Sequence, residues 1–354
     1  MNKLLQVGLL GFGMSGRVFH APFISSIPGL ALKKIRANRP ESIAAAQAAY
    51  PAAELVTEDK AILEDEEIDL VIVATTNATH YSLAKAALLA GKHVVVEKPF
   101  TVTSDEASEL IALAKHQHRI LTVYHNRRWD SDFKTVQKVL ESKLLGNLVE
   151  YEAHFDRFRN AIKPDTWKEE DTPGTNLLYD LGSHLIDQAL YLFGMPETVA
   201  ADLRIQRPEG KIIDYFEVHL HYPNELKATL KAGMLVKQPG PHFILSGDQG
   251  SFVKYGMDVQ EAALKKGLSP ALVPEWGVEP ESLWGSLDTE YKGLRFVGKI
   301  QSEVGDYRGF YENVYRAILG QEELTVKPEQ ARNTIRIIEL AMQSSAEKRT
   351  LALH

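Results

Sequence analysis

An apolar strand that runs directly into a glycine-rich turn is the feature that most constrains the fold of this chain. The sequence reads Val7-Gly8-Leu9-Leu10 and continues with the spacing G-x-G-x-x-G over Gly11-Phe12-Gly13-Met14-Ser15-Gly16. In a strand–turn–helix unit, the first glycine permits the turn, the second lets the backbone approach a pyrophosphate, and the third lets the helix pack close to the strand. The spacing therefore predicts a dinucleotide cradle over residues 11–16, although a purely structural glycine turn would give the same pattern.

The end of the expected second strand bears on the choice of cofactor. NAD-binding folds usually place an Asp or Glu about 20 residues beyond the glycines, where it holds the ribose 2′-hydroxyl. Here the strand ends in Arg36-Ala37-Asn38-Arg39, and no acidic residue appears before Glu41. A guanidinium pairs with a 2′-phosphate that a carboxylate would repel. We therefore predict NADP rather than NAD, bound by Asn38 and Arg39; the alternative is that these arginines are solvated turn residues.

Composition excludes several classes of protein. The 354 residues are 44% hydrophobic and 25% charged, which is typical of a globular protein with a sizeable core. The net charge of −7 argues against a nucleic-acid or anionic-membrane binder. The absence of cysteine excludes disulfides, thiolate catalysis and cysteine-ligated zinc. Neither a signal-peptide pattern nor an apolar run of about 20 residues is present, so we expect a cytoplasmic protein.

Strands and helices alternate over the first 123 residues. The runs 70–74 and 93–96 are apolar and β-branched, which is typical of strands buried on both faces of a parallel sheet. Residues 1–123 are therefore predicted to form a doubly wound α/β Rossmann domain. We expect its strands at 5–10, 30–37, 69–75, 93–97 and 119–124, and its helices near 41–49, 78–90 and 104–117, the last opening with a capping-box pattern at Thr103 and Glu106.

Residues 124–354 are predicted to form a second, α+β domain. Strands between 197 and 255 follow one another through short connections, which is typical of antiparallel pairing in an open sheet. With too few helices to cover both faces of that sheet, we expect one face to bury against another copy in a homodimer or homotetramer. The other expected elements are helices near 131–143, 176–193, 308–319 and 328–346, a strand over 148–156, a polar loop over 157–173 and an irregular stretch over 265–300.

Two short motifs could carry chemistry. Lys98 follows the expected strand over 93–97, at the sheet edge where ligands of open α/β sheets bind, and Pro99 restricts its backbone to an extended form. Asp180 and His184 are four residues apart, so both would lie on one face of a helix, and an imidazole suits acid–base chemistry at neutral pH. The alternatives are a surface lysine at the start of a loop and an ordinary helical Asp–His pair. Gly182 bares the backbone between the pair.

Taken together, these motifs resemble those of the Gfo/Idh/MocA (glucose–fructose oxidoreductase/inositol dehydrogenase) family over essentially the whole chain. The resemblance rests on the glycine turn, on Glu97-Lys98-Pro99, and on Asp180-x-Gly182-x-His184-x-x-Asp187. Within the family, the chain is most similar to an NADP-dependent scyllo-inositol dehydrogenase-like branch. That further similarity is carried by the stretches 20–23, 125–130, 180–188 and 250–256.

The resemblance implies an oxidoreductase that moves a hydride between the nicotinamide and a cyclitol or sugar-like hydroxyl or ketone, without a metal. Lys98, Asp180 and His184 match the catalytic positions: His184 as the general base in oxidation, Lys98 at the substrate oxygen, and Asp180 orienting the pair. The expected cofactor contacts beyond the turn and the 2′-phosphate site are Thr75, Asn77, His80, Glu97, Lys98 and Asn126. The expected substrate contacts are Lys98, Arg127, Asp156, Trp167, Asp180 and His184.

Some interpretations stay open at this point. Asn126 and Arg127 could form a structural hinge, and Asp156, Arg157 and Trp167 could belong to a solvated loop. The aromatic residues Phe310, Tyr311 and Tyr315 have helical spacing and are expected to be core. Two other functions are compatible with the same fold: a reductase of an unrelated carbonyl or imine, and a non-catalytic dinucleotide sensor. The proton-handling set of Lys98, Asp180 and His184 favours catalysis, because a sensor has no need of it.

Overall fold

The computed structural model describes residues 3–164 and 166–353. Its contacts divide the chain into two compact units. The first unit comprises residues 1–126, 260–276 and 306–332, and the second comprises 127–259, 277–305 and 333–354. The expected boundary at residue 123 thus lies close to the end of the first stretch. The two later segments of the first unit were assigned by sequence to the second domain.

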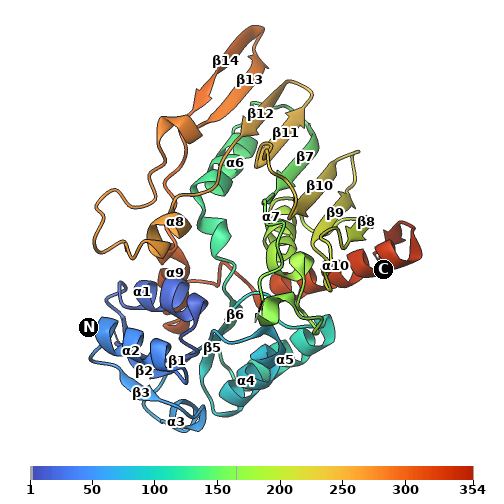
Figure 1. Ribbon diagram of the computed structural model, residues 1–354. Helices are drawn as coiled ribbons and strands as arrows, with labels where there is room; N and C mark the ends of the chain where they lie inside the picture. The colour runs from blue at the N-terminus through green and yellow to red at the C-terminus, as the bar shows by residue number, and fades with distance from the viewer. Residues whose placement is uncertain (1–2, 165, 354) are drawn as a thin grey trace. The chain divides into compact units, whose positions relative to one another are not determined.

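The first unit is built on a six-stranded sheet in the order β3-β2-β1-β4-β5-β6, with every neighbouring pair parallel. The strand order reverses between β1 and β4, and such a switch point is where doubly wound sheets bind ligands. The strands are β1 (Leu5–Leu10), β2 (Leu30–Arg36), β3 (Glu54–Val56), β4 (Leu70–Val73), β5 (His93–Val96) and β6 (Leu121–Val123) (Figure 1). This confirms the α/β fold class; β3 is a short strand that the sequence analysis missed.

Helices complete the first unit. They are η1 (Gly16–His20), α1 (Ala21–Ile24), α2 (Pro40–Ala49), α3 (Lys60–Leu63), α4 (Asn77–Leu89), α5 (Ser104–His116), α8 (Gln260–Lys265) and α9 (Arg308–Ile318). The predicted capping box is present at the start of α5, where Thr103 accepts from the Glu106 backbone. Phe310, Tyr311 and Tyr315 of α9 are buried, as expected for core residues. The ring centroids of Phe310 and Tyr124, the latter just beyond β6, lie 4.8 Å apart.

The second unit contains a nine-stranded sheet in the order β14-β13-β12-β11-β7-β10-β9-β8-β15. All neighbours are antiparallel except β7 and β10, which confirms the expected mostly antiparallel sheet. The strands are β7 (Leu148–His154), β8 (Thr198–Arg204), β9 (Tyr215–His221), β10 (Lys227–Gly233), β11 (Phe243–Gly247), β12 (Gly250–Lys254), β13 (Gly285–Tyr291), β14 (Leu294–Ile300) and β15 (Leu351–Ala352). Its helices are η2 (Asn126–Trp129), which starts in the first unit, α6 (Ser131–Glu141), η3 (Trp167–Glu169), η4 (Leu178–Gly182), α7 (Ser183–Phe193), η5 (Glu281–Leu283) and α10 (Pro328–Glu347), which also spans both units.

The stretch 265–300 is irregular, as expected, only up to residue 284, apart from the short helix η5. It contains the hairpin β13–β14, whose two-residue turn at Lys292 and Gly293 has positive φ at both positions (Figure 1). Such a turn matches the twist of the flanking strands. The hairpin forms one edge of the sheet. At the opposite edge, Ser344 and Ser345 of α10 accept hydrogen bonds from the backbone N–H groups of Ala201 and Leu203, at 3.1 and 3.0 Å.

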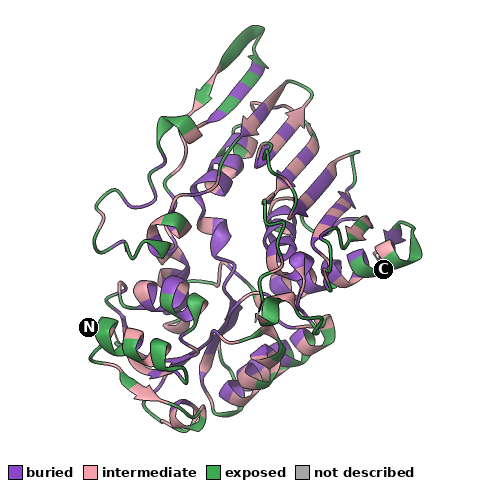
Figure 2. Ribbon diagram, in the orientation of Figure 1, coloured by how far each residue is buried: buried purple, intermediate pink, exposed green. Residues whose placement is uncertain are grey.

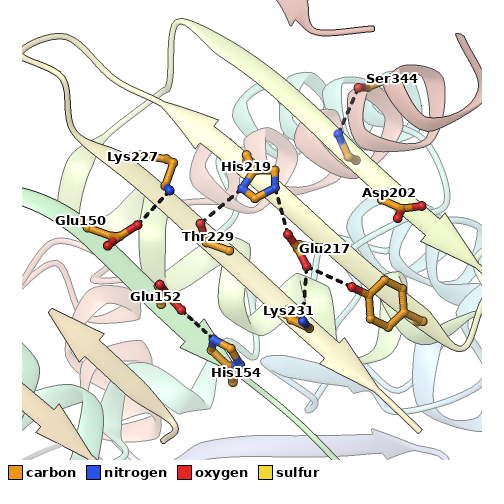
Figure 3. A network of polar contacts seen from close by, with 12 residues as sticks. Glu150, Glu152, His154, Asp202, Glu217, His219, Lys227, Thr229, Lys231 and Ser344 are labelled. Carbon is orange, nitrogen blue, oxygen red and sulfur yellow. Dashed lines mark hydrogen bonds and ion pairs between the residues drawn. The ribbon is translucent and has the colours of Figure 1, made fainter. Parts of the chain in front are cut away.

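The two faces of the second sheet differ in character. Along β9, Phe216, Val218 and Leu220 are fully buried, and the side chains between them are half-exposed (Figure 2). On the half-exposed face, acidic and basic side chains alternate (Figure 3). Glu217 pairs with both Lys231 (3.3 Å) and His219 (3.1 Å). This face is therefore polar and internally neutralised, although it is only partly exposed. None of the helices in the described ranges is long and apolar enough to cross a bilayer.

Candidate functional site

The glycine turn lies between the ends of β1 and β4. Gly11 has a φ of 103°, and a Cβ at this position would lie 2.4 Å from the carbonyl oxygen of Ala74. A Cβ on Gly16 would lie 2.1 Å from the carbonyl oxygen of Gly11. At Gly13, by contrast, no atom comes within 4 Å of the Cβ position. The turn is thus tightly packed except at Gly13, where a backbone at a helix N-terminus faces open space. These residues fit the pyrophosphate of a dinucleotide.

The other residues of the turn have distinct environments. Phe12 is buried, with its ring edge-on to Tyr50. Met14 is half exposed, and Ser15 donates a hydrogen bond from Oγ to Oε1 of Glu97 at 2.9 Å. Beyond Ser15, residues 16–20 wind as a π-helix, a form that is common at functional sites. The turn is therefore tied directly to the end of β5.

The segment after β2 carries a basic side chain, that of Arg39, which forms no ion pair with the described residues. Arg36 is held by Asp59, with Nε 3.1 Å from Oδ1. Asn38 and Arg39 are exposed, and no hydrogen bond or ion pair joins the Arg39 guanidinium to the described part of the chain. Of the two arginines that the sequence offered, Arg39 is thus the one available to an anionic ligand.

The loop after β4 is fixed by His80, which is fully buried. Its Nδ1 lies 2.8 Å from the carbonyl oxygen of Pro99, and its Nε2 lies 3.4 Å from that of Thr75. Burial lowers the pKa of His80, so the ring stays neutral. The Thr75 hydroxyl lies 2.7 Å from that of Thr79, and the half-buried Asn77 starts α4. His80 therefore links this loop to the segment that carries Lys98.

Glu97 and Lys98 follow β5. Glu97 is buried, and besides Ser15 it faces His20, whose Nε2 lies 3.4 Å from Oε1. Burial by itself would raise the pKa of Glu97, but its contact with His20, the charge of Lys98 and the hydrogen bond from Ser15 hold this pKa below its usual value. Lys98 is half-buried. The first unit thus brings together the turn, Glu97, Lys98, His80 and Thr75.

The helix that carries Asp180 and His184 runs without a break over Leu178–Phe193, close to the expected range. Its first five residues, Leu178–Gly182, form a π-helix, and the α-helix α7 continues from Ser183. Asp180 therefore lies in a wider turn than the α-helical one that the sequence predicts, and His184 lies in the first turn of α7. Asp180 is half-buried, and His184 is buried.

Several buried contacts fix α7 within the second unit. Arg128 forms a bidentate pair with Asp187, at 2.9 and 2.7 Å, and Gln188 donates to the carbonyl oxygen of Arg127 at 3.2 Å. Gly182 leaves room for the side chain of Leu178, because a Cβ there would lie 2.7 Å from Cδ1 of Leu178. Asp187 of the sequence motif therefore positions the helix that carries His184.

Aromatic and basic side chains surround His184. The ring centroid of Phe155 lies 6.3 Å from that of His184, and the Arg127 guanidinium lies 4.9 Å from the Phe155 centroid. Arg157 lies over the same ring at 5.5 Å, and His242 lies 5.6 Å from it. The sequence analysis missed Phe155 and His242. Phe155 directly follows a strand in which apolar and polar residues alternate, so the sequence pattern suggests a core residue. His242 is a single histidine before a strand, and no motif around it indicates a functional site.

Three predicted site residues have other surroundings. Asp156 lies 3.5 Å from Nδ1 of His154, whose pKa this interaction raises. Trp167 is partly exposed in the short helix η3, with Lys168 over its ring. Asn126 is buried and is the last residue of the first stretch of the first unit. Their predicted contacts with ligand remain predictions.

Comparison with known proteins is consistent with this arrangement. The model of an oxidoreductase family, NAD-binding Rossmann fold, matches residues 5–125. The model of the C-terminal alpha/beta domain of an oxidoreductase family matches residues 137–353. The chain is 40% identical over 349 residues to the scyllo-inositol 2-dehydrogenase (NADP(+)) IolW of Bacillus subtilis, covering 99% of this chain and 96% of that protein. It is also 40% identical to the uncharacterized oxidoreductase YdgJ of Escherichia coli, with 100% of both chains covered.

Solved structures show the same fold. The structure of yvaA from Bacillus subtilis matches with a TM-score of 0.95 at 39% identity, covering 100% of this chain and 99% of that one. An oxidoreductase from Bacillus cereus matches with a TM-score of 0.90 at 36% identity, covering 99% of each chain. Both matches extend over both units.

Proposed function

The chain belongs to the Gfo/Idh/MocA family of NAD(P)-dependent oxidoreductases, and from this premise we propose that it transfers a hydride between NADP(H) and a carbinol carbon of a cyclitol or sugar-like polyol. The observation that carries the substrate class is the match of 40% over 99% of the chain to a protein named scyllo-inositol 2-dehydrogenase (NADP(+)). The retention of Lys98, Asp180 and His184 supports a catalytic rather than a sensory role.

Each proposed catalytic residue has a chemical task. The bound nicotinamide would supply the hydride acceptor or donor. In oxidation, His184 accepts the alcohol proton, because an imidazole with an ordinary pKa near 6.5 acts as a base at neutral pH. The Lys98 ammonium donates a hydrogen bond to the substrate oxygen and offsets the charge that develops on it. Asp180 orients the pair. The Arg127 side chain next to Phe155 supports a polar substrate environment around His184.

The preference for NADP follows from the segment after β2. Arg39 is a guanidinium without a partner in the described residues, and no carboxylate ends the strand to repel a 2′-phosphate. Arg36 is held by Asp59 and is a poorer candidate. We assign the 2′-phosphate to Arg39, with Asn38 beside it in the chain.

Assembly is part of the same proposal. The half-exposed polar face of the second sheet carries paired opposite charges, such as Glu150 and Lys227 at 2.8 Å (Figure 3). Two copies can therefore meet across this face without a net repulsion, and a symmetric contact uses one patch twice. We assign this face to a homodimer or homotetramer contact.

The proposal is tested by turnover. The wild-type protein, His184→Ala, Lys98→Met and the double variant are assayed with NADP⁺ against a panel of cyclitols and sugars, following nicotinamide reduction. His116→Ala, at the exposed end of α5, serves as the matched control. We expect His184→Ala to lower kcat by about 10²–10⁴-fold with little change in NADP⁺ affinity. The double variant should lose much less than the product of the single losses, because both residues act on one proton transfer.

Three outcomes would contradict the proposal. Dinucleotide binding without turnover of any compound in the panel favours the sensor. A His184→Ala enzyme with near-normal kcat on the best substrate removes this histidine from the chemistry. Turnover of ketones or imines but of no polyol points to the reductase instead.

A further inference from the structure

His20 lies at the centre of a buried polar chain in the first unit. Its ring is fully buried, with Nδ1 2.6 Å from the Tyr311 hydroxyl and Nε2 3.4 Å from Oε1 of Glu97. The ring of Tyr124 packs against it with a centroid distance of 4.5 Å. Tyr311 belongs to α9, so a residue from near the end of the chain contacts the helix that follows the glycine turn.

Glu97 connects this row of buried polar side chains to the expected cofactor site. The same Oε1 that faces His20 accepts the hydrogen bond from Ser15 of the glycine turn. In the sequence, Glu97 directly precedes Lys98. A single carboxylate is therefore anchored to the turn that would hold the pyrophosphate and to the segment that carries Lys98.

Of the two ring contacts of His20, the one with the Tyr311 hydroxyl is a hydrogen bond, and the one with the Glu97 carboxylate is a polar contact at 3.4 Å. Nε2 of His20 faces a carboxylate and therefore carries a proton. In the neutral ring, Nδ1 is then the acceptor, and the Tyr311 hydroxyl donates to it. Burial, together with the charge of Glu97, raises the pKa of Tyr311 well above its usual value, so this hydroxyl keeps its proton. Tyr311 thus fixes the ring, and the ring in turn fixes the carboxylate.

A buried carboxylate is destabilising unless it is well partnered, and apolar side chains would fill the same space at lower free energy. The structure keeps this charge at the carboxyl edge of the sheet, where the dinucleotide is expected. Oxidised and reduced nicotinamide differ by one positive charge on the ring. A fixed negative charge therefore distinguishes the two forms, whereas a neutral site does not.

We propose that His20 and Tyr311 are positioning residues that hold the Glu97 carboxylate so that it favours the oxidised, cationic nicotinamide over the reduced, neutral one. The proposal rests on the proposed binding of NADP(H). Its chemical consequence is that bound NADPH is a stronger hydride donor than free NADPH. Because the affinities of the two forms and the hydride-donor strength are linked, the effect can be measured by binding alone.

The test compares the dissociation constants for NADP⁺ and NADPH in the wild-type protein and in variants. Glu97→Gln keeps an oxygen for Ser15 but removes the charge, and we expect it to weaken NADP⁺ relative to NADPH by about tenfold. His20→Gln and Tyr311→Phe should shift the ratio in the same direction by about threefold. The matched control is Tyr315→Phe, which removes another buried hydroxyl of α9, one that donates to the carbonyl oxygen of Lys3.

The ratio separates positioning from a merely structural role. A structural role weakens both cofactor forms equally and leaves the ratio unchanged, which would overturn the proposal. Equal ratios for Tyr311→Phe and Tyr315→Phe would also overturn it. If Glu97→Gln does not fold, Tyr311→Phe still decides the question. The measurement needs no substrate, so failure of polyol oxidation leaves it intact; a wild-type protein that binds neither NADP⁺ nor NADPH refutes the proposed function and this inference together.

Discussion

Asp132 should make the stability of the protein fall as the pH rises through neutrality. It is fully buried near the start of α6; its Oδ1 accepts from the Phe133 backbone at 2.7 Å, and its Oδ2 makes no hydrogen bond with any described residue. Burial, reinforced by the charge of Asp258 and opposed by that of Lys254, raises its pKa from 3.8 to about 7. The Asp132 carboxyl is therefore protonated in the fold at mildly acidic pH, where the unfolded chain would carry a charge.

The size of the effect follows from the shift. A shift of about three pKa units at about 1.4 kcal/mol per unit gives an upper bound near 4 kcal/mol. Asp258, Glu279 and Lys254 share the same environment, so we expect roughly 2–4 kcal/mol. Because the folded pKa lies above the unfolded one, this contribution is complete below the unfolded pKa, and it is lost as the pH rises through about 7.

Asp132→Asn removes the titration and keeps the shape of the side chain. The free energy of unfolding is measured by urea denaturation between about pH 5 and pH 8 for the wild type, for Asp132→Asn, and for the control Asp288→Asn at an exposed pair with Arg295. The wild type and the control should lose stability across this range, and Asp132→Asn should lose much less. Parallel profiles for all three proteins would refute the argument.

Three further results are expected. Arg39→Ala should weaken NADP⁺ by roughly one to two decades while changing NAD⁺ affinity little, because a charge-assisted contact of about 1.5–3 kcal/mol is lost; equal losses for both cofactors in a titration would contradict the assignment. Light scattering at micromolar concentration should give a dimer or tetramer that Lys231→Glu weakens, because the change leaves Glu217 unneutralised and gives the face an excess of negative charge in both copies; a monomeric wild type would reject the sheet contact. Ser344→Ala and Ser345→Ala should each lower the unfolding free energy by about 1 kcal/mol in urea, and an unchanged midpoint would mean that water replaces the hydroxyls.

The elements that the sequence predicts well are those with strong local signals. The β-branched runs of β4 and β5 lie within a few residues of their expected ranges, because strands buried on both faces need such side chains. The hairpin β13–β14 was missed, because its turn uses Lys292 rather than the usual Asn or Asp before glycine. The π-helices at 16–20 and 178–182 leave no local signal, because they depend on how the next helix packs.

The residues of the candidate site also fall into those that local motifs predict and those that they do not. Gly11, Gly16 and Lys98 were found from short motifs, since each motif is a local backbone requirement. His20 and Tyr311 are 291 residues apart, and neither belongs to a motif with a known chemistry. Asp156 contacts His154, a pairing that no motif in the sequence indicates, and its contact with substrate remains a prediction. Contacts between distant segments are what the sequence alone cannot supply.

The discontinuous first unit has a consequence for synthesis on the ribosome. Chains emerge from the N-terminus, and domains generally fold as they emerge. Here the first 126 residues must wait for 260–276 and for 306–332 before their unit is complete, and until then Tyr124 lacks its cover of Phe310 and Tyr311. The backbone N–H groups at the edge of β8 likewise lack their serine partners until Ser344 and Ser345 have been synthesised. Translation of α10 is therefore the step that closes the sheet of the second unit, and a stop codon before α10 would leave the β8 edge exposed to chaperones and proteases.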